Sequence, residues 1–167
     1  ICKIRRQKTI EISVPAGIDD DQILNVGGKG NAGSNGGPNG DLHVYITVRP
    51  HAIFTRRGND VWCDMPITFT QAALGAEVTV PTLDGKVSYT VHEGTQPGDV
   101  FKLKGKGIQS INGRGRGDQY VRVTVEVPKN LSKRQKELLQ EFEQNADEKN
   151  YQKRKSFFGK IKDLFED

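Results

Sequence analysis

Two short segments of this 167-residue sequence place a lysine between glycines, a pattern that can bind phosphate. They are Gly27–Gly30 and Gly105–Gly107. A phosphate-binding loop of the P-loop type has spaced glycines, then Lys-Ser or Lys-Thr at the start of a helix. Here a glycine-rich or polar stretch follows each lysine. Both segments are therefore better explained as turns.

Two other charged segments suggest ion or nucleic-acid binding. Asp19–Asp21 invites a calcium interpretation, but calcium loops alternate their ligands and end in glutamate, so a solvated turn is favoured. Gly113–Gly117 alternates glycine with arginine, as nucleic-acid-binding segments do. It is short and contains no aromatic residue, which favours a loop.

Residues that could act as nucleophiles or metal ligands are few and scattered. There is no Ser-His-Asp or Cys-His arrangement, and two cysteines cannot form a disulfide framework or a cysteine-rich zinc site. The histidines and cysteines of the chain are His43, His51, His92, Cys2 and Cys63. Cys63 lies in the predicted strand 61–69, where a small packed side chain is expected. We expect neither an enzyme nor a metal site.

The composition excludes further classes of protein. Hydrophobic residues make up 34% of the chain, and no apolar run approaches the roughly 18 residues that a membrane-spanning helix needs. The first residues have no apolar signal-peptide core. The formal net charge of +4 is small, and the charges are mixed. The cysteine content fits a reducing compartment, and we expect a cytoplasmic protein.

The chain contains an internal repeat of 77 residues. Without a gap, residues 8–49 match residues 85–126 with 12 identities in 42 positions. The identical residues of the first copy are Val14, Gly17, Gly28, Lys29, Gly30, Asn35, Gly36, Gly40, Asp41, Val44, Thr47 and Val48. Apolar alternation stays in register between the copies, so we interpret the match as a duplication.

The duplication predicts an all-β fold with two related β-sandwich-like domains in tandem, followed by a C-terminal helix. Residues 51–128 contain a complete unit, whereas residues 1–50 resemble only its back half. We therefore expect the first domain to be incomplete and to expose a strand edge. Residues 129–146 are predicted to form the helix, and 147–167 a polar linker with a short amphipathic tail.

Strands are predicted where apolar and polar residues alternate between glycine turns. The predicted strands are 8–14, 22–26, 41–49, 61–69, 77–82, 86–91, 100–104 and 119–127. Asp84-Gly85 is a strong signal for a tight hairpin turn, and 70–74 could form one helical turn.

Ser132 and Gln135 form a capping-box pattern, which predicts a helix from about Lys133. Its apolar stripe contains Leu138, Leu139 and Phe142 and has no obvious core left to cover. The stripe can pack on its own domain or contact a partner, and the sequence leaves both open. For the terminal segment 157–166, docking on the same protein, weak membrane contact and partner binding also stay open.

An ordered series of motifs runs along the chain: Val14–Ile18, Gly28–Gly33, Gly40–Val44, Pro50–Asp60, Ala73–Gly75, Val80–Gly85 and Gly105–Gly107. This series resembles the C-terminal region of the DnaJ co-chaperone family, in its bacterial, zinc-containing class. The resemblance runs from about Thr9 to Phe142. The His-Pro-Asp signature of the J-domain, the glycine-phenylalanine linker and the cysteine repeat of the zinc module are not in this sequence.

The resemblance implies a region that binds unfolded polypeptides, forms a homodimer and serves a DnaK-type chaperone. It implies that zinc belongs only to a cysteine-rich module outside this sequence, which interrupts the first β-domain. Without the J-domain signature, we expect no stimulation of the DnaK-type ATPase. No cofactor, nucleic acid or membrane partner is expected.

The resemblance also suggests where clients bind. It places Ile10 and Val44 in the client pocket of the first domain, and Ile12 and Ile46 share their strand faces. The repeat puts Val87 and Val121 at the equivalent points of the second domain. Ordinary sandwich core is the alternative for all of these residues. By resemblance, Leu138, Leu139 and Phe142 belong to the dimerisation helix.

One function of a different class competes with the client-binding hypothesis. A β-rich protein could bind nucleic acid through its basic glycine loops. Neutralising phosphates would make such binding fall steeply with salt, which a client-binding protein would not show.

Overall fold

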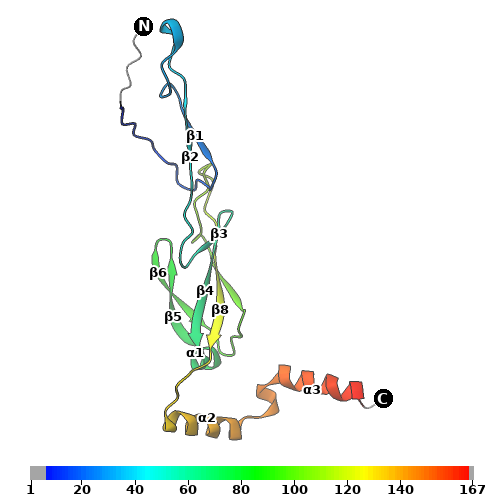
Figure 1. Ribbon diagram of the computed structural model, residues 1–167. Helices are drawn as coiled ribbons and strands as arrows, with labels where there is room; N and C mark the ends of the chain where they lie inside the picture. Colours follow the sequence, from blue (N-terminus) through cyan, green and yellow to red (C-terminus); the bar gives the residue numbers. More distant parts are fainter. Residues whose placement is uncertain (1–6, 166–167) are drawn as a thin grey trace. The chain divides into compact units, whose positions relative to one another are not determined.

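The computed structural model describes residues 7–165 and is built mostly of strands, with helices at the C-terminal end. The chain divides into two compact units, Ile1–Glu126 and Val127–Asp167. The first unit contains all of the described strands, as Figure 1 shows. It has the all-β architecture that the sequence predicts.

A four-stranded sheet lies at the centre of the second repeat. Its order is β3-β4-β8-β7, and its strands are β3 (Thr55–Arg57), β4 (Asp60–Thr68), β7 (Val100–Leu103) and β8 (Gln119–Glu126). The two central strands, β4 and β8, run parallel over eight paired residues, whereas β3 and β7 pair antiparallel at the edges. Inward residues of β4 and β8 are buried and alternate with exposed ones, as expected for a sheet with one face on a core.

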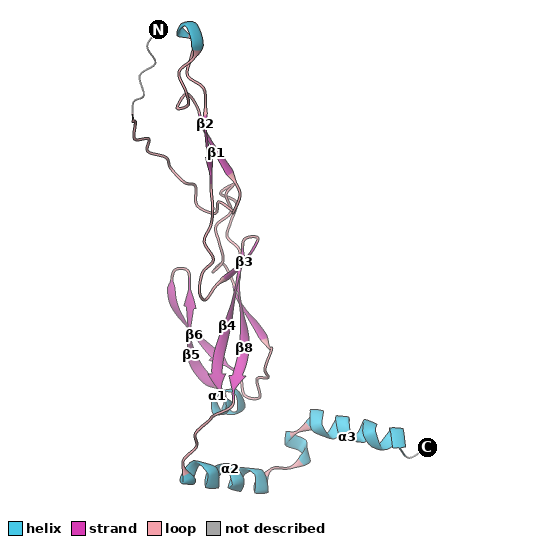
Figure 2. Cartoon of the chain, viewed as in Figure 1, coloured by secondary structure: helices cyan, strands magenta, loops and turns pink. Residues whose placement is uncertain are grey.

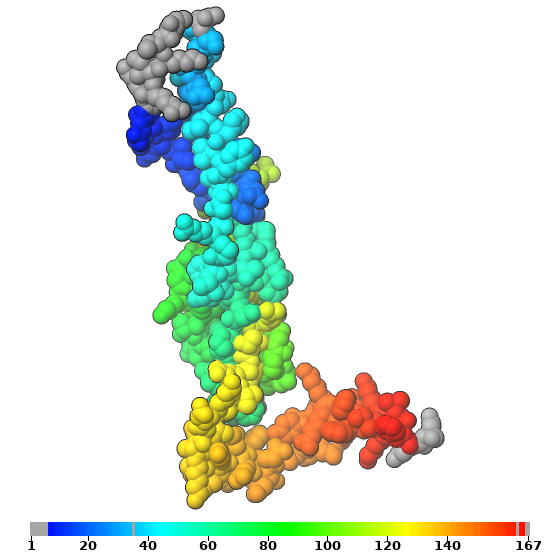
Figure 3. All heavy atoms as spheres, in the orientation of Figure 1, coloured from blue at the N-terminus to red at the C-terminus, as the bar shows by residue number. Residues whose placement is uncertain are grey.

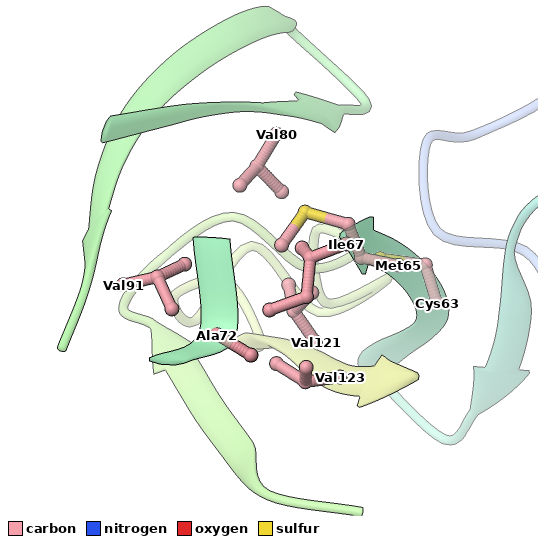
Figure 4. Packing of buried hydrophobic residues seen from close by; sticks show 8 residues of the cluster. All are labelled: Cys63, Met65, Ile67, Ala72, Val80, Val91, Val121 and Val123. Carbon is pink, nitrogen blue, oxygen red and sulfur yellow. The ribbon is translucent and has the colours of Figure 1, made fainter. Parts of the chain in front are cut away.

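A hairpin and a short helix enclose the core of this repeat. The hairpin consists of β5 (Ala76–Thr82) and β6 (Gly85–Val91), and the helix is α1 (Phe69–Leu74). The turn falls at Asp84-Gly85, as predicted, with Gly85 at φ 126°. Side chains from all of these elements meet in one apolar cluster, which Figure 4 shows: Cys63, Met65, Ile67, Ala72, Val80, Val91, Val121 and Val123.

The first repeat reproduces part of this architecture with the same register. It contains β1 (Ile23–Val26), a 3₁₀ turn η1 (Ser34–Gly36) and β2 (Leu42–Tyr45) (Figure 2). Ile23 pairs with Tyr45, and Val100 pairs with Arg122, which are the same two positions 77 residues later. The duplication inferred from sequence is thus repeated in strand pairing.

Residues 8–14 do not form the strand predicted from their alternation. Their counterpart in the second repeat is β6, which forms its strand hydrogen bonds with β5. A shift of β5 by 77 residues gives positions before residue 6, which lie outside the described residues. A strand requires a partner for its backbone N–H and C=O groups. The alternation therefore indicates which side chains share a face, but cannot by itself create the strand.

The C-terminal unit consists of helices. They are α2 (Lys133–Asn145), the 3₁₀ turn η2 (Glu148–Asn150) and α3 (Gln152–Phe165). The predicted capping box is present: Ser132 Oγ accepts the N–H of Gln135, whose side chain accepts the N–H of Ser132. Within the segment 147–167, predicted as a polar linker with a short amphipathic tail, helix α3 begins already at Gln152.

Candidate binding surface

The hairpin of β1 and β2 presents an apolar face that is only half buried. Along β1, Leu24 and Val26 are half buried and alternate with exposed neighbours. Along β2, Leu42 and Val44 do the same, and Ile46 continues the pattern beyond the strand end. The register places Leu24 directly opposite Val44, so these side chains lie on one face. The result is a continuous strip of accessible aliphatic surface.

In the second repeat, the equivalent face of the sheet is covered by other elements and belongs to the core. Val121, the counterpart of Val44, is 0% exposed, and Val123, the counterpart of Ile46, is 1% exposed. Both lie in the core cluster with residues of β4, α1, β5 and β6. No element among residues 7–50 covers the first hairpin in this way. Equivalent valines therefore have different surroundings in the two repeats.

This comparison corrects the client-site prediction for the second repeat. Val121 has no surface to offer a client, because it is fully enclosed by the core. Val87 is half buried and packs against the same cluster. Beside it, the rings of Tyr89 and Phe101 stack with centroids 3.7 Å apart. Val121 is therefore a residue of the sandwich core, which was the alternative to a client-binding role.

Ile10 and Ile12 are half buried within the segment that lacks strand structure. Val14, two residues on, is 51% exposed. In the space-filling view, residues 7–14 (dark blue) lie at the surface of the first unit (Figure 3). No backbone hydrogen bond joins this segment to β1 or β2 within the described chain. Ile10 and Ile12 thus keep the predicted alternation, and their place in a client pocket with Val44 stays a prediction.

The two glycine-lysine-glycine segments close the hairpin loops of both repeats in the same manner. The N–H of Gly28 donates to Asp41 Oδ1 at 2.9 Å, and the N–H of Gly105 donates to Asp118 Oδ1 at 2.7 Å. The hydrogen bond from Gly105 lowers the pKa of Asp118, and so does the ammonium group of Lys102, whose Nζ lies 3.2 Å from Asp118 Oδ2. The same hydrogen bond from a glycine N–H to an aspartate closes the turn in both repeats, which matches the turn interpretation of these segments.

Arg56 fixes the first repeat to the second. Its guanidinium donates to the carbonyl oxygens of Ile18 (2.7 Å), Gly17 (2.9 Å) and Gly58 (2.8 Å). A β-carbon placed on Gly17 would lie 2.0 Å from the carbonyl oxygen of Gln109, so the turn fits closely against the second repeat. This contact could not be predicted from the sequence, because an isolated arginine in a turn has the same pattern as a solvated surface charge.

The charged segments considered for ion or nucleic-acid binding have structural contacts. Asp20 Oδ1 accepts the N–H of Val48 at 2.8 Å, and Asp19 lies 3.5 Å from Arg56. Arg116 makes two hydrogen bonds to the carboxylate of Asp84, at 2.7 and 2.8 Å. These contacts match the turn and loop interpretations of both segments.

Among the side chains that the structure describes, no cluster of three or more His, Cys, Asp or Glu residues could hold a metal ion. Cys63 is buried, and burial raises the pKa of its thiol. Gln119 Nε2 lies 3.4 Å from its sulfur. Cys2 lies outside the described residues. The cysteine that can be placed is a packed core residue and does not fit a zinc site.

Helix α2 carries a second accessible apolar surface, separate from the hairpin. Leu138, Leu139 and Phe142 are 47%, 38% and 49% exposed, and no residue of the helix is buried. These are the three residues that the sequence suggested for dimerisation. Their exposure is compatible with partner contact, and no second chain is present to test it.

Comparison with known proteins identifies two matching family models. One, described as DnaJ C terminal domain, matches residues 3–128, and one described as Chaperone protein DnaJ C-terminal region matches residues 134–167. In the described part of the chain, no helix is long and apolar enough to cross a membrane.

Two similar curated relatives carry the same name, Chaperone protein DnaJ. The protein from Ruminiclostridium cellulolyticum is 60% identical over 163 residues, which is 98% of this chain and 43% of that relative. The protein from Clostridioides difficile is 55% identical over 161 residues, 96% of this chain and 42% of that relative. The chain therefore spans less than half the length of these relatives.

Proposed function

We propose that this chain, which belongs to the DnaJ C-terminal domain family, binds non-native polypeptides through the half-buried apolar face of its first hairpin. The observation that carries the proposal is the set of half-buried aliphatic side chains on one face of this hairpin. Leu24 and Val26 of β1 share the face with Leu42 and Val44 of β2, and the register sets Leu24 opposite Val44. Val121, the counterpart of Val44, is enclosed with residues of β4, α1 and β5, whose counterparts lie outside residues 7–50.

The chemistry of this face suits unfolded chains of varied sequence. Its aliphatic side chains lack hydrogen-bonding groups, so they select only for apolar side chains of a client. The hairpin is a two-stranded sheet, and an extended client can add to a sheet edge through main-chain hydrogen bonds. Main-chain bonds do not depend on side-chain identity, which matches a protein that binds many clients.

Family membership supports two further parts of the proposal. The bound client is passed to a DnaK-type chaperone, and the chain acts as a homodimer through Leu138, Leu139 and Phe142 of α2. We propose no catalytic activity and no cofactor for this region. Any zinc belongs to a cysteine-rich module that these residues do not form.

The direct test is suppression of aggregation by the intact chain without ATP or other chaperones. A chemically unfolded model enzyme is diluted into buffer with increasing amounts of the chain, and light scattering is recorded. We expect suppression near a one-to-one ratio, and no binding when the native enzyme replaces the unfolded one. Undiminished aggregation at a large excess of the chain would contradict the proposal.

The same preparation tests the competing nucleic-acid hypothesis. Polynucleotide binding that falls steeply between low and moderate salt would indicate phosphate contacts. The structure gives this alternative little support, because Arg116 and Lys106 of the glycine loops already contact Asp84.

A further inference from the structure

We propose that helix α3 binds the surface of membranes that contain anionic lipids. Its 14 residues include five basic side chains and five apolar ones, three of which are phenylalanines. This site is separate from the client-binding face of the first repeat. The basic and the apolar side chains occupy different parts of the helix surface.

The apolar residues of α3 form one broad face. At about 100° per residue, they occupy an arc of about 120°. They are Phe157, Phe158, Ile161, Leu164 and Phe165. All except the half-buried Ile161 are exposed, from 53% for Phe158 to 83% for Phe165. Large apolar side chains therefore cover a face that nothing in the described part of the C-terminal unit encloses.

Lysines follow both borders of this face. On the same helical projection, Lys153 and Lys160 lie just beyond one edge of the arc, and Lys155 and Lys162 lie just beyond the other. The side of the helix opposite the arc carries Gln152, Ser156, Gly159 and one acidic residue, Asp163. A helix lying in a membrane surface has this distribution, because lysines at the borders extend to the headgroups while the rings enter the acyl boundary.

Within the side chains that the structure describes, three of the four border lysines have no acidic partner. Among the described residues, Lys153, Lys160 and Lys162 make no ion pair, whereas Lys155 lies 3.0 Å from Glu148. Arg154, which projects within the arc at the start of the helix, lies 3.9 Å from Glu143. The free positive charge is therefore concentrated at the borders, where anionic headgroups would lie.

Helix α2 provides an internal contrast. It has three apolar residues in its stripe instead of five, and the borders of that stripe include Glu141 and Glu143. An anionic surface would repel these carboxylates. The competing occupant for α3 is thus the acidic border of α2 in a second copy of the chain, and the experiment must separate the two.

The test is co-sedimentation of the intact chain with vesicles. Vesicles of phosphatidylcholine and phosphatidylglycerol in equal parts are compared with vesicles of phosphatidylcholine alone. We expect binding to the anionic vesicles only, weakened by raising the salt concentration. Each lysine at such a surface contributes roughly fivefold in affinity, so the double variant Lys160→Glu, Lys162→Glu should lose at least tenfold.

The matched control is the double variant Lys133→Glu, Lys136→Glu, which changes the net charge equally but lies on α2. It should bind within about threefold of the parent chain, since its lysines are not at the proposed surface. Absence of binding, equal binding to both vesicle types, or unaltered binding of the α3 variant would each overturn the proposal. So would a change in the mass of the chain in solution caused by the α3 variant, which would identify a second copy as the occupant. No client takes part in these measurements, so their outcome is independent of the proposed chaperone function.

Discussion

Gly17 and Gly28 both adopt positive φ angles, 86° and 66°, yet they have different surroundings. Space around Gly28 is open, whereas a β-carbon at Gly17 would collide with the backbone of Gln109. Gly28→Ala therefore reports backbone strain alone, of about 1 kcal/mol. We expect Gly17→Ala to lower the free energy of unfolding by a further 1–3 kcal/mol through the forced displacement.

Thermal unfolding of the two variants measures the difference. An equal loss in both would show that the turn at Gly17 is not fixed against the second repeat. The carbonyl contacts of Arg56 would then have little effect on the arrangement of the first unit.

Asp118 links the stability of the second repeat to pH. Its pKa is lowered chiefly by the N–H of Gly105 and then by Lys102. A carboxyl group with a lowered pKa stabilises the fold above its unfolded pKa, and this contribution is lost as the pH falls through the folded pKa. We expect the difference in melting temperature between the parent chain and Asp118→Asn to be largest near neutral pH and to shrink below about pH 4. A difference that does not change with pH would contradict this assignment.

Among the elements, apolar alternation, turn and cap signals and the 77-residue repeat together predicted most of the described strands and the start of α2. Shifting β1 by 77 residues reproduces β7 from end to end, and the hairpin at Asp84-Gly85 and the capping box at Ser132 are present. The repeat was informative because strand parity and glycine turns are local properties of the sequence. Pairing with a distant strand is not local, which is why residues 8–14 were wrongly predicted as a strand.

The candidate surface was only partly predictable for the same reason. Alternation shows that Val44 and Val121 face inward, but it does not show whether a second layer covers them. That depends on β4, α1 and β5, which exist for the second repeat and have no counterpart among residues 7–50. The contacts of Arg56 could not be predicted, because its partners are backbone carbonyls about 38 residues away and a backbone carbonyl is present at every residue, whatever its side chain.

The capping box predicts how α2 responds to a single change. Ser132 Oγ satisfies the N–H of Gln135, so Ser132→Ala should destabilise the helix by about 1 kcal/mol. Ser132→Asp retains an acceptor and serves as the control. Circular dichroism should show a loss of helical signal for the alanine variant alone. Equal helicity in both variants would mean that the cap does not hold the start of α2.

At the scale of the whole molecule, the exposed stripe on α2 predicts a dimer. Burying each of its three large side chains against a partner would contribute on the order of 1.5–3 kcal/mol. Light scattering should give a dimeric mass for the intact chain and a monomeric mass after truncation at Asn130. Truncation after Asn150, which removes α3 but keeps α2, should leave the dimer intact. A monomeric intact chain, or a dimer that survives the shorter truncation, would reject this role for α2.

Serine substitutions at Ile10, Val44 and Val121 test whether an accessible apolar face in the first repeat binds clients. Fluorescence anisotropy measures the affinity of a labelled unfolded peptide for the parent chain and for Ile10→Ser, Val44→Ser and Val121→Ser, with thermal melting of each. We expect Ile10→Ser and Val44→Ser to weaken binding about tenfold with little change in melting, since each removes roughly 1.4 kcal/mol of apolar contact. Val121→Ser should melt far earlier, because a hydroxyl in the core costs about 2–4 kcal/mol. Full client affinity in Ile10→Ser and Val44→Ser, or early melting of both, would contradict the account.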